Sequence, residues 1–171
     1  MSDMLPLTCR GNNKRPTKTD GMRNLAAAEL VDGMIKSGSL IEADREECIR
    51  DLLKATRSYV GDGYEIAREL ERSCHWDCNM QIVEELDEFS SILDRIFNTA
   101  EDVWAKENPH DPLFSDGDVV IWRGQQAMVS GVYEYRPQRY KVRQGELKAT
   151  SYYVVPFEDV SAVAPTETPN V

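Results

Sequence analysis

The stretch DCNMQIVEELDEFSSILDRIFNTAEDVWAK, residues 77–106, decides the fold of this chain. Its apolar residues recur at alternating steps of four and three, which places them on one stripe of an α-helix. Asp77 precedes the stripe as a candidate N-cap, and Pro109 and Pro112 follow its end. The stripe consists of Ile82, Leu86, Phe89, Leu93, Ile96, Ala100 and Val103, widened by Val83, Phe97 and Trp104.

A helix over this stretch would span about 45 Å and form a hydrophobic spine. Two interpretations fit its length: the core of an intramolecular bundle, or a coiled coil that joins two copies of the chain. The opposite face of the helix is acidic, with Glu84, Glu85, Asp87, Glu88, Asp94, Glu101 and Asp102.

The charge of the chain is concentrated in its middle. Of the 171 residues, 30 are Asp or Glu and 20 are Lys or Arg, which gives a net charge of −10. Residues 41–117 hold eight basic and twenty acidic groups, a net charge of −12, whereas residues 1–40 sum to +2 and residues 118–171 to zero. An acidic surface repels nucleic acid and anionic membranes, so we expect it to attract a basic protein or to imitate a phosphate backbone.

The segments before the spine predict a basic arm and three shorter helices. Prolines, glycine and asparagines break any periodicity in residues 1–20, which carry four of the five cations Arg10, Lys14, Arg15, Lys18 and Arg23. We expect this arm to be a solvated tail or to dock on a partner or nucleic acid. Apolar spacing predicts helices over about 22–36, 43–58 and 62–73, the last with the capping spacing Asp62 to Glu65.

The period changes after Phe114, where short runs rich in valine and tyrosine indicate strands. Glycines and a proline separate the runs, which cover residues 118–122, 125–135, 139–142, 151–155 and 160–163. Five short strands within about 50 residues favour a small closed barrel over an open sheet.

The spacing of glycines and strands in this region resembles a small SH3-like barrel of the KOW or Tudor type. The resemblance covers residues 114–163. Its residues are Phe114, Gly117-Asp118-Val119-Val120, Gly124, Val129-Ser130-Gly131-Val132, Tyr140-Lys141-Val142, Tyr153-Val154-Val155 and Phe157-Glu158-Asp159-Val160. Barrels of this type bind proteins, RNA or DNA and serve as structural modules in phage head–tail connectors, so the resemblance implies a binding or structural role.

No constellation for catalysis or metal binding is evident. Cys74, His75 and Cys78, together with Cys48, could in principle ligate zinc, but only one close pair of thiols is present where structural sites favour two. No serine, cysteine or lysine has a recognisable activating partner. We therefore expect no enzymatic activity, no cofactor and no metal.

Two surfaces are candidates for a partner. The acidic face of the long helix offers Glu84, Glu85, Asp87 and Glu88, and the barrel offers aromatic residues interleaved with cations. Tyrosine, tryptophan and arginine dominate protein hot spots and can also stack on nucleic-acid bases. The barrel candidates are Trp122, Arg123, Tyr133, Tyr135, Arg139, Tyr140 and Lys141, with Tyr152 and Tyr153 close in the sequence.

The sequence thus predicts an α+β protein with an acidic four-helix bundle and a five-stranded SH3-like barrel. The predicted organisation is an arm over 1–20, a helical domain over 21–108, a linker over 109–115, the barrel over 116–163 and a tail over 164–171. No signal peptide and no apolar run of membrane-spanning length is visible, so we expect a cytoplasmic or virion location.

The predicted function is a non-enzymatic protein-binding or assembly protein, encoded by a phage or another mobile element. It either joins a larger assembly or forms a homo-oligomer through the long helix. One alternative is an acidic inhibitor that mimics nucleic acid. The other is a nucleic-acid-binding module that uses the barrel and the basic arm.

Overall fold

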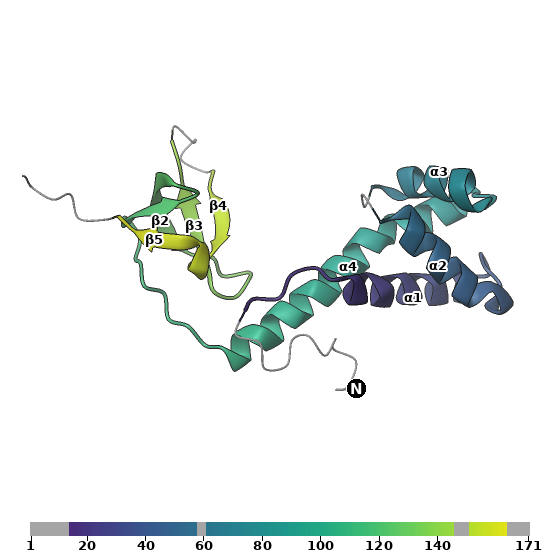
Figure 1. Ribbon diagram of the computed structural model, residues 1–171, viewed down its shortest axis with the longest axis horizontal. Coiled ribbons are helices and arrows are strands. Elements are labelled where there is room, and N and C mark those ends of the chain that lie inside the picture. Colours follow the sequence, from purple (N-terminus) through teal and green to yellow (C-terminus); the bar gives the residue numbers. More distant parts are fainter. Residues whose placement is uncertain (1–13, 58–60, 146–150, 164–171) are drawn as a thin grey trace, which may run out of the picture. The chain divides into compact units, whose positions relative to one another are not determined.

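The computed structural model describes residues 14–57, 61–145 and 151–163, and it has the predicted α+β architecture. Four α-helices come first and a five-stranded antiparallel sheet follows (Figure 1). The chain divides into two compact units, Met1–Trp104 and Ala105–Val171, which we call the helical unit and the sheet unit. The division falls inside the last helix, before the linker that the sequence indicated. Residues 1–13 of the predicted arm and the predicted tail, 164–171, lie outside the described residues.

The helices begin and end where capping residues favour it. Thr19 accepts a hydrogen bond from the Met22 N–H at the start of α1, and Gly38 ends this helix in the left-handed conformation. Asp62 accepts from the Glu65 N–H at the start of α3, as predicted. The predicted second helix is divided into a short 3-10 turn and a shorter α-helix. The bounds are α1 Asp20–Ser37, η2 Glu42–Asp44, α2 Arg45–Ala55, α3 Gly63–Cys74 and α4 Met80–Glu107.

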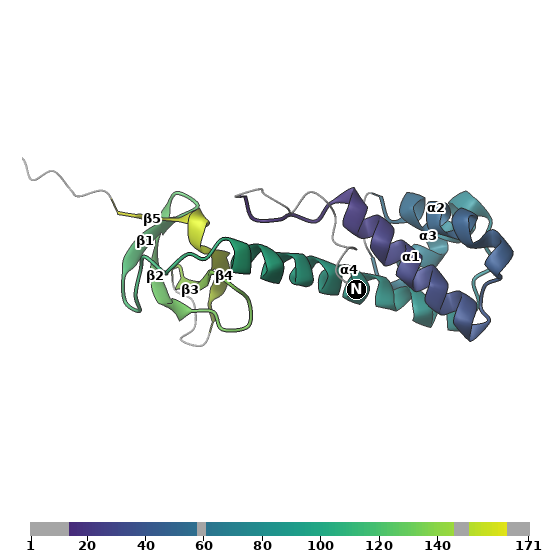
Figure 2. The same ribbon diagram turned by 90° about the horizontal axis from the view of Figure 1, so that it is seen from below.

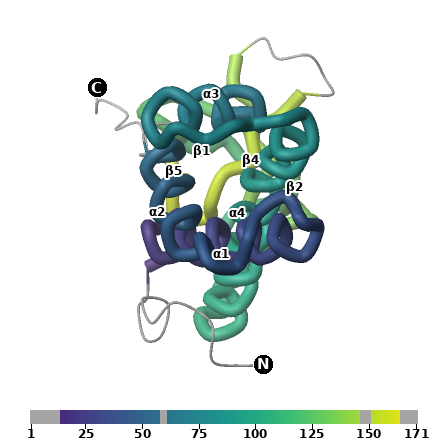
Figure 3. The backbone as a smooth tube through the Cα atoms, turned by 90° about the vertical axis from the view of Figure 1, so that its right-hand side faces the viewer, coloured from purple at the N-terminus to yellow at the C-terminus, as the bar shows by residue number. Residues whose placement is uncertain are grey.

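The apolar stripe of α4 forms the centre of the helical core. The other three helices gather at one end of α4 and bury its stripe there (Figures 1 and 3). Burying a leucine or phenylalanine side chain contributes roughly 1.5–3 kcal/mol, so these residues hold the four helices together. The buried residues of α4 in this cluster are Ile82, Leu86, Phe89, Leu93 and Ala100.

The C-terminal part of α4 differs from the prediction. The sequence placed Glu101 on the outer acidic face, yet its side chain is 1% exposed, whereas Val103 of the predicted stripe is only half-buried. The cause is Arg15, whose Nη1 donates a hydrogen bond to Glu101 Oε1 at 2.9 Å. Helical periodicity does not reveal an ion pair that is formed by a residue 86 positions away.

The sheet unit contains the five predicted strands in the order β4-β3-β2-β1-β5, with every pair antiparallel. The turn between β1 and β2 consists of Arg123 and Gly124, whose φ angles of 52° and 75° are those of a tight two-residue hairpin. The strands are β1 Val119–Trp122, β2 Gln125–Val132, β3 Arg139–Arg143, β4 Tyr153–Pro156 and β5 Val160–Ala162.

The sheet is not closed into a barrel, but it is strongly curled (Figures 1 and 2). β4 and β5 are the two edge strands, and the 3-10 turn η3, Phe157–Asp159, joins them directly. Four intervals between strands would separate the edges of a flat sheet by about 19 Å. A 3-10 turn rises only about 2 Å per residue, so it cannot cover that distance. The sheet must therefore bend until its two edges approach each other.

The concave side of this curl holds the core of the sheet unit. Alternate residues of each strand point to it, as the period of two requires. Tyr140 is 1% exposed, and its hydroxyl accepts a hydrogen bond from the Phe114 N–H at 3.0 Å. Tyr140 is therefore a core residue and not part of the exposed surface in which the sequence placed it. The buried residues are Val120, Trp122, Ala127, Val129, Tyr140, Val142, Val155 and Val160.

Candidate protein-binding surface

Strand β3 separates its cations from its apolar residues by simple alternation. Tyr140 and Val142 point to the core and are fully buried. Arg139, Lys141 and Arg143 occupy the alternate positions, so all three lie on the opposite, convex face of the sheet. Three basic residues on one strand of one face make that face locally cationic in an otherwise acidic protein.

A cluster of three tyrosine rings adjoins these cations. The ring centroids of Tyr133 and Tyr135 are 5.5 Å apart, and those of Tyr133 and Tyr152 are 6.3 Å apart. Lys141 Nζ lies 5.9 Å from the centroid of the Tyr152 ring. Tyr135 is 75% exposed and Tyr152 is 42% exposed, although both rings are large and apolar. We call Tyr133, Tyr135, Tyr152 and Lys141 the tyrosine cluster.

The strand register explains why these residues meet. Lys141 pairs with Val154 of β4, and Tyr152 precedes Val154 by two positions, so Tyr152 lies diagonally across from Lys141 on the same face. The Tyr133 N–H donates to the Arg139 carbonyl at 2.7 Å, which holds the other two rings beside the end of β3. Lys141 is thus fixed within β3, and the three tyrosines lie just beyond the ends of β2 and β4 that flank it.

The remaining candidates of the predicted barrel surface lie elsewhere. Trp122 is 6% exposed, its ring centroid lies 4.8 Å from that of Tyr153, and the guanidinium of Arg123 lies 4.7 Å from the Trp122 ring centroid. Tyr153 pairs with the inward-facing Val142, so this group belongs to the concave side. The sequence therefore grouped residues that the sheet divides between its two faces.

Three cations of the sheet unit have no acidic partner among the described residues. Within the part of the chain that the structure describes, no ion pair is formed by Arg123, Lys141 or Arg143. The cationic face of the sheet is therefore able to attract an acidic group of a partner.

The four acidic candidates on α4 do not form one uniform surface. Glu84 and Glu88 are exposed, whereas Glu85 is half-buried. Asp87 accepts a hydrogen bond from the Gly63 N–H, the first N–H of α3. This N–H has no partner within its own helix, so Asp87 has a structural role at the contact between α3 and α4.

We expect Asp87→Ala to lower the free energy of unfolding of the helical unit by about 1–2 kcal/mol, because it removes a charged acceptor at a helix N-terminus. Chemical denaturation followed by the helical circular dichroism signal measures this change. Glu88→Ala, at the next exposed position of the same helix, is the control and should change stability by less than about 0.5 kcal/mol. Equal effects of the two substitutions would contradict the structural role of Asp87.

Cys74, His75 and Cys78 lie at the connection between α3 and α4, and Cys48 lies within α2. His75 is exposed and ends α3 in the left-handed conformation, with a φ of 61°. Cys48, Cys74 and Cys78 are free thiols, and burial raises the pKa of both Cys48 and Cys78. Among the described residues, no three His, Cys, Asp or Glu side chains are arranged to hold a metal ion.

Burial, with the charges of Glu71 and Asp77, raises the pKa of the Cys78 thiol to about 11. Because only the thiolate is nucleophilic, we expect Cys78 to be alkylated at pH 8 about 100-fold more slowly than an ordinary thiol. The rate should rise as the pH approaches 11. Peptide mass spectrometry after timed alkylation of the native protein measures the rate for each cysteine. Rapid labelling of Cys78 in the folded protein at pH 8 would contradict this environment.

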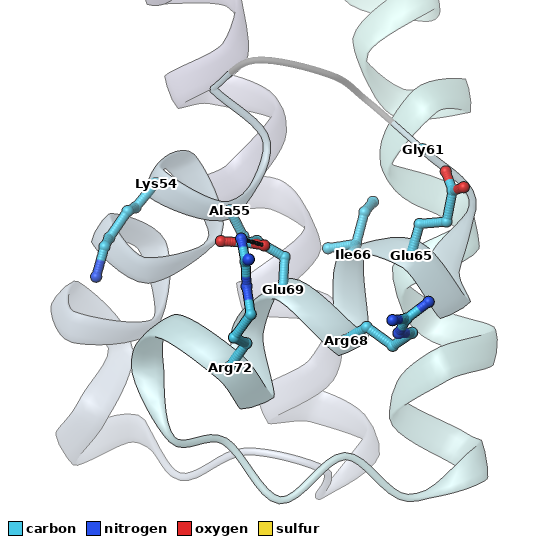
Figure 4. Close-up of a pocket in the computed structure, with 8 residues that line it drawn as sticks. All are labelled: Lys54, Ala55, Gly61, Glu65, Ile66, Arg68, Glu69 and Arg72. Atoms are coloured by element: carbon cyan, nitrogen blue, oxygen red, sulfur yellow. Dashed lines mark hydrogen bonds and ion pairs between the residues drawn. The ribbon is translucent and has the colours of Figure 1, made fainter.

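A pocket of about 450 Å³ lies between α2 and α3 (Figure 4). Two of its cations are engaged: Arg72 pairs with Glu69, and Lys54 donates to the Ser73 carbonyl at 2.8 Å. Its described lining residues do not include a nucleophile beside a base. The lining residues are Lys54, Ala55, Gly61, Glu65, Ile66, Arg68, Glu69 and Arg72.

Comparison of the chain with protein-family models, with curated proteins and with solved structures finds no match. Within the described ranges, every helix is too short or too polar to cross a bilayer.

Proposed function

We propose that this chain is a non-enzymatic protein-binding protein that contacts its partner through the tyrosine cluster. The observation that carries the proposal is the exposure of Tyr135 and Tyr152 in a cluster of rings that adjoins Lys141 of β3. Tyrosine gives a large amphipathic contact area and loses little side-chain entropy on binding, which is why it dominates protein hot spots. Lys141 then adds electrostatic complementarity toward an acidic group of the partner.

The sheet unit is proposed to be an SH3-like domain. Two features support this proposal: the last strand pairs with the first, and the 3-10 turn η3 precedes the last strand. We propose that this domain binds its partner within a larger assembly, as SH3-like barrels do in phage head–tail connectors. The proposed role needs no catalytic group.

A second candidate is single-stranded nucleic acid, because such sites combine a cationic track with exposed aromatic rings. Arg139, Lys141 and Arg143 share one face with the tyrosine cluster, which favours this candidate. The rings of the cluster, however, contact one another at interplanar angles of 66° and 56°. Stacked bases require ring faces that are free, so this geometry favours a protein partner.

The acidic mimic of nucleic acid receives less support. Glu85 is half-buried and Asp87 is engaged with α3, so Glu84 and Glu88 are the two of the four candidates that are exposed with no hydrogen bond in the described part of the chain. Two carboxylates on one helical turn do not reproduce the regular charge of a phosphate backbone.

Comparative capture from native lysate tests the proposed function. Three immobilised proteins are used: the wild type, a variant with Tyr135→Ser and Lys141→Glu, and the control Tyr64→Ser. Tyr64 is 62% exposed on α3 and so matches the exposure of the cluster without belonging to it. Each capture is done with and without nuclease, and we expect a protein that the wild type and the control retain under both conditions and that the cluster variant loses. The same retained proteins for all three would contradict the proposal, and loss of retention on nuclease treatment would favour nucleic acid.

A further inference from the structure

The described part of the basic arm, Lys14 to Thr19, lies along α4 and is held there by two cations. Arg15 Nη1 donates to Glu101 Oε1 at 2.9 Å, and the Arg15 guanidinium lies 4.7 Å from the centroid of the Trp104 ring. Lys18 forms an ion pair with Asp94. The arm therefore binds the chain's own helix. The sequence predicted instead a solvated tail or an arm that docks on a partner or nucleic acid.

The spacing of the two acidic residues along α4 matches the spacing of the two cations along the arm. Asp94 and Glu101 are seven residues apart, which is two helical turns or about 10.5 Å along the axis of α4. Arg15 and Lys18 are three residues apart, and three residues of extended chain cover about 10 Å. An extended segment with an arginine and, three residues on, a lysine therefore fits this side of α4. We call Asp94, Glu101 and Trp104 the arm site.

The arm site differs from an ordinary surface ion pair because the two charged side chains that meet there are buried. The side chain of Glu101 is 1% exposed and that of Arg15 is 9% exposed. A carboxylate at that depth costs several kcal/mol unless a cation accompanies it, so Glu101 requires a partner such as Arg15. The backbone from Arg15 to Thr19 has no helical or strand structure. The contacts of Arg15 and Lys18 with α4 are therefore made by side chains, and the segment adds no helix or strand pairing to them.

We propose that the arm site also binds the arm of a second copy of this chain, so that two copies exchange arms across adjacent α4 helices. Every copy carries the ligand that the site accepts, and exchange of an identical element is a low-cost route to a dimer. Four residues connect Arg15 to the start of α1 and reach about 14 Å. Two packed helices lie 8–10 Å apart, so an arm reaches the α4 of a copy packed beside it. This inference goes beyond the proposed function and is independent of the sheet unit.

A charge reversal divided between two proteins tests the exchange. Arg15→Glu places two carboxylates at the site, and Glu101→Arg places two cations there, so neither variant can seat its own arm. In a mixture of the two, each arm is complementary to the site of the other protein. We expect each variant alone to be monomeric, and the mixture to contain a heterodimer of twice the chain mass by light scattering. Association in the mixture should be at least about tenfold tighter than in either variant alone.

The double variant with both substitutions in one chain is the control, because it restores the pair with reversed polarity and should behave as the wild type. A mixture that stays monomeric while the double variant behaves as the wild type would overturn the exchange and leave the arm bound only within its own chain. If Glu101→Arg prevents folding, the mixture pairs a chain carrying Arg15→Glu and Lys18→Glu with a chain carrying Glu101→Gln and Asp94→Lys. The side chains of Lys18 and Asp94 are about half exposed, and glutamine keeps the size of Glu101, so these substitutions leave the core intact. That mixture must then show the heterodimer, and its absence would overturn the proposal.

Discussion

Gly63→Ala is expected to lower the free energy of unfolding of the helical unit by about 2–3 kcal/mol. Gly63 is the first residue of α3, and it is buried where α3 touches α4. A Cβ atom at this position would lie 2.2 Å from the Val83 carbonyl oxygen and 2.8 Å from the Asp87 backbone nitrogen. Both are backbone atoms of α4, so neither can move aside as a flexible side chain would. The two helices must separate, and the hydrogen bond from Gly63 to Asp87 is lost with the contact.

Gly33→Ala is the matched control for this prediction. Gly33 lies inside α1, is exposed, and has no atom within 4 Å of the position that a Cβ would take. Alanine favours a helix over glycine by about 1 kcal/mol, so this variant should be more stable than the wild type. Urea denaturation of both variants measures the two changes. A Gly63→Ala protein as stable as the wild type would contradict the close contact of α3 with α4.

Leu93→Ala is expected to destabilise the helical unit by about 2–5 kcal/mol. Leu93 is 4% exposed and belongs to the core cluster in which α4 meets the other helices. Truncation removes apolar contacts and leaves a cavity that the surrounding helices cannot fully close. Denaturation followed by helical circular dichroism measures the loss.

Ser91→Ala is the control for Leu93, because Ser91 is exposed on the same helix two positions earlier. Its substitution should change stability by less than about 0.5 kcal/mol. A similarly small change for Leu93→Ala would mean that its side chain is not in the core. The prediction that the stripe of α4 packs within its own chain would then fail.

Periodicity predicted the elements of this protein well because it records which residues a single element buries. The four-three spacing from Ile82 to Ala100 sufficed to place α4 and most of its buried face. The two-residue period and the glycines sufficed to place five strands. These signals are local, and tertiary packing here agrees with them.

Contacts between distant segments were beyond the reach of those signals. The sequence predicted a solvent-facing charge at Glu101, because no residue near it in the sequence indicates that Arg15 is its partner. Tyr140 and Tyr152 look equivalent as tyrosines among cations, and the pairing of β3 with β4 decides that one is in the core and the other on the convex face. A shift of one residue in that register would exchange their positions. The composition of the candidate surface was therefore predictable, but its division between two faces was not.

The affinity of a captured partner for two single variants tests the central claim most directly. Tyr152 and Tyr153 are neighbours with similar exposure, 42% and 45%, but they lie on opposite faces of the sheet. We expect Tyr152→Ala to weaken binding at least about tenfold, or about 1.4 kcal/mol, and Tyr153→Ala to change it little. Titration calorimetry with the purified partner measures both affinities. Unchanged affinity for Tyr152→Ala, or a greater loss for Tyr153→Ala, would contradict the assignment of the tyrosine cluster as the binding surface.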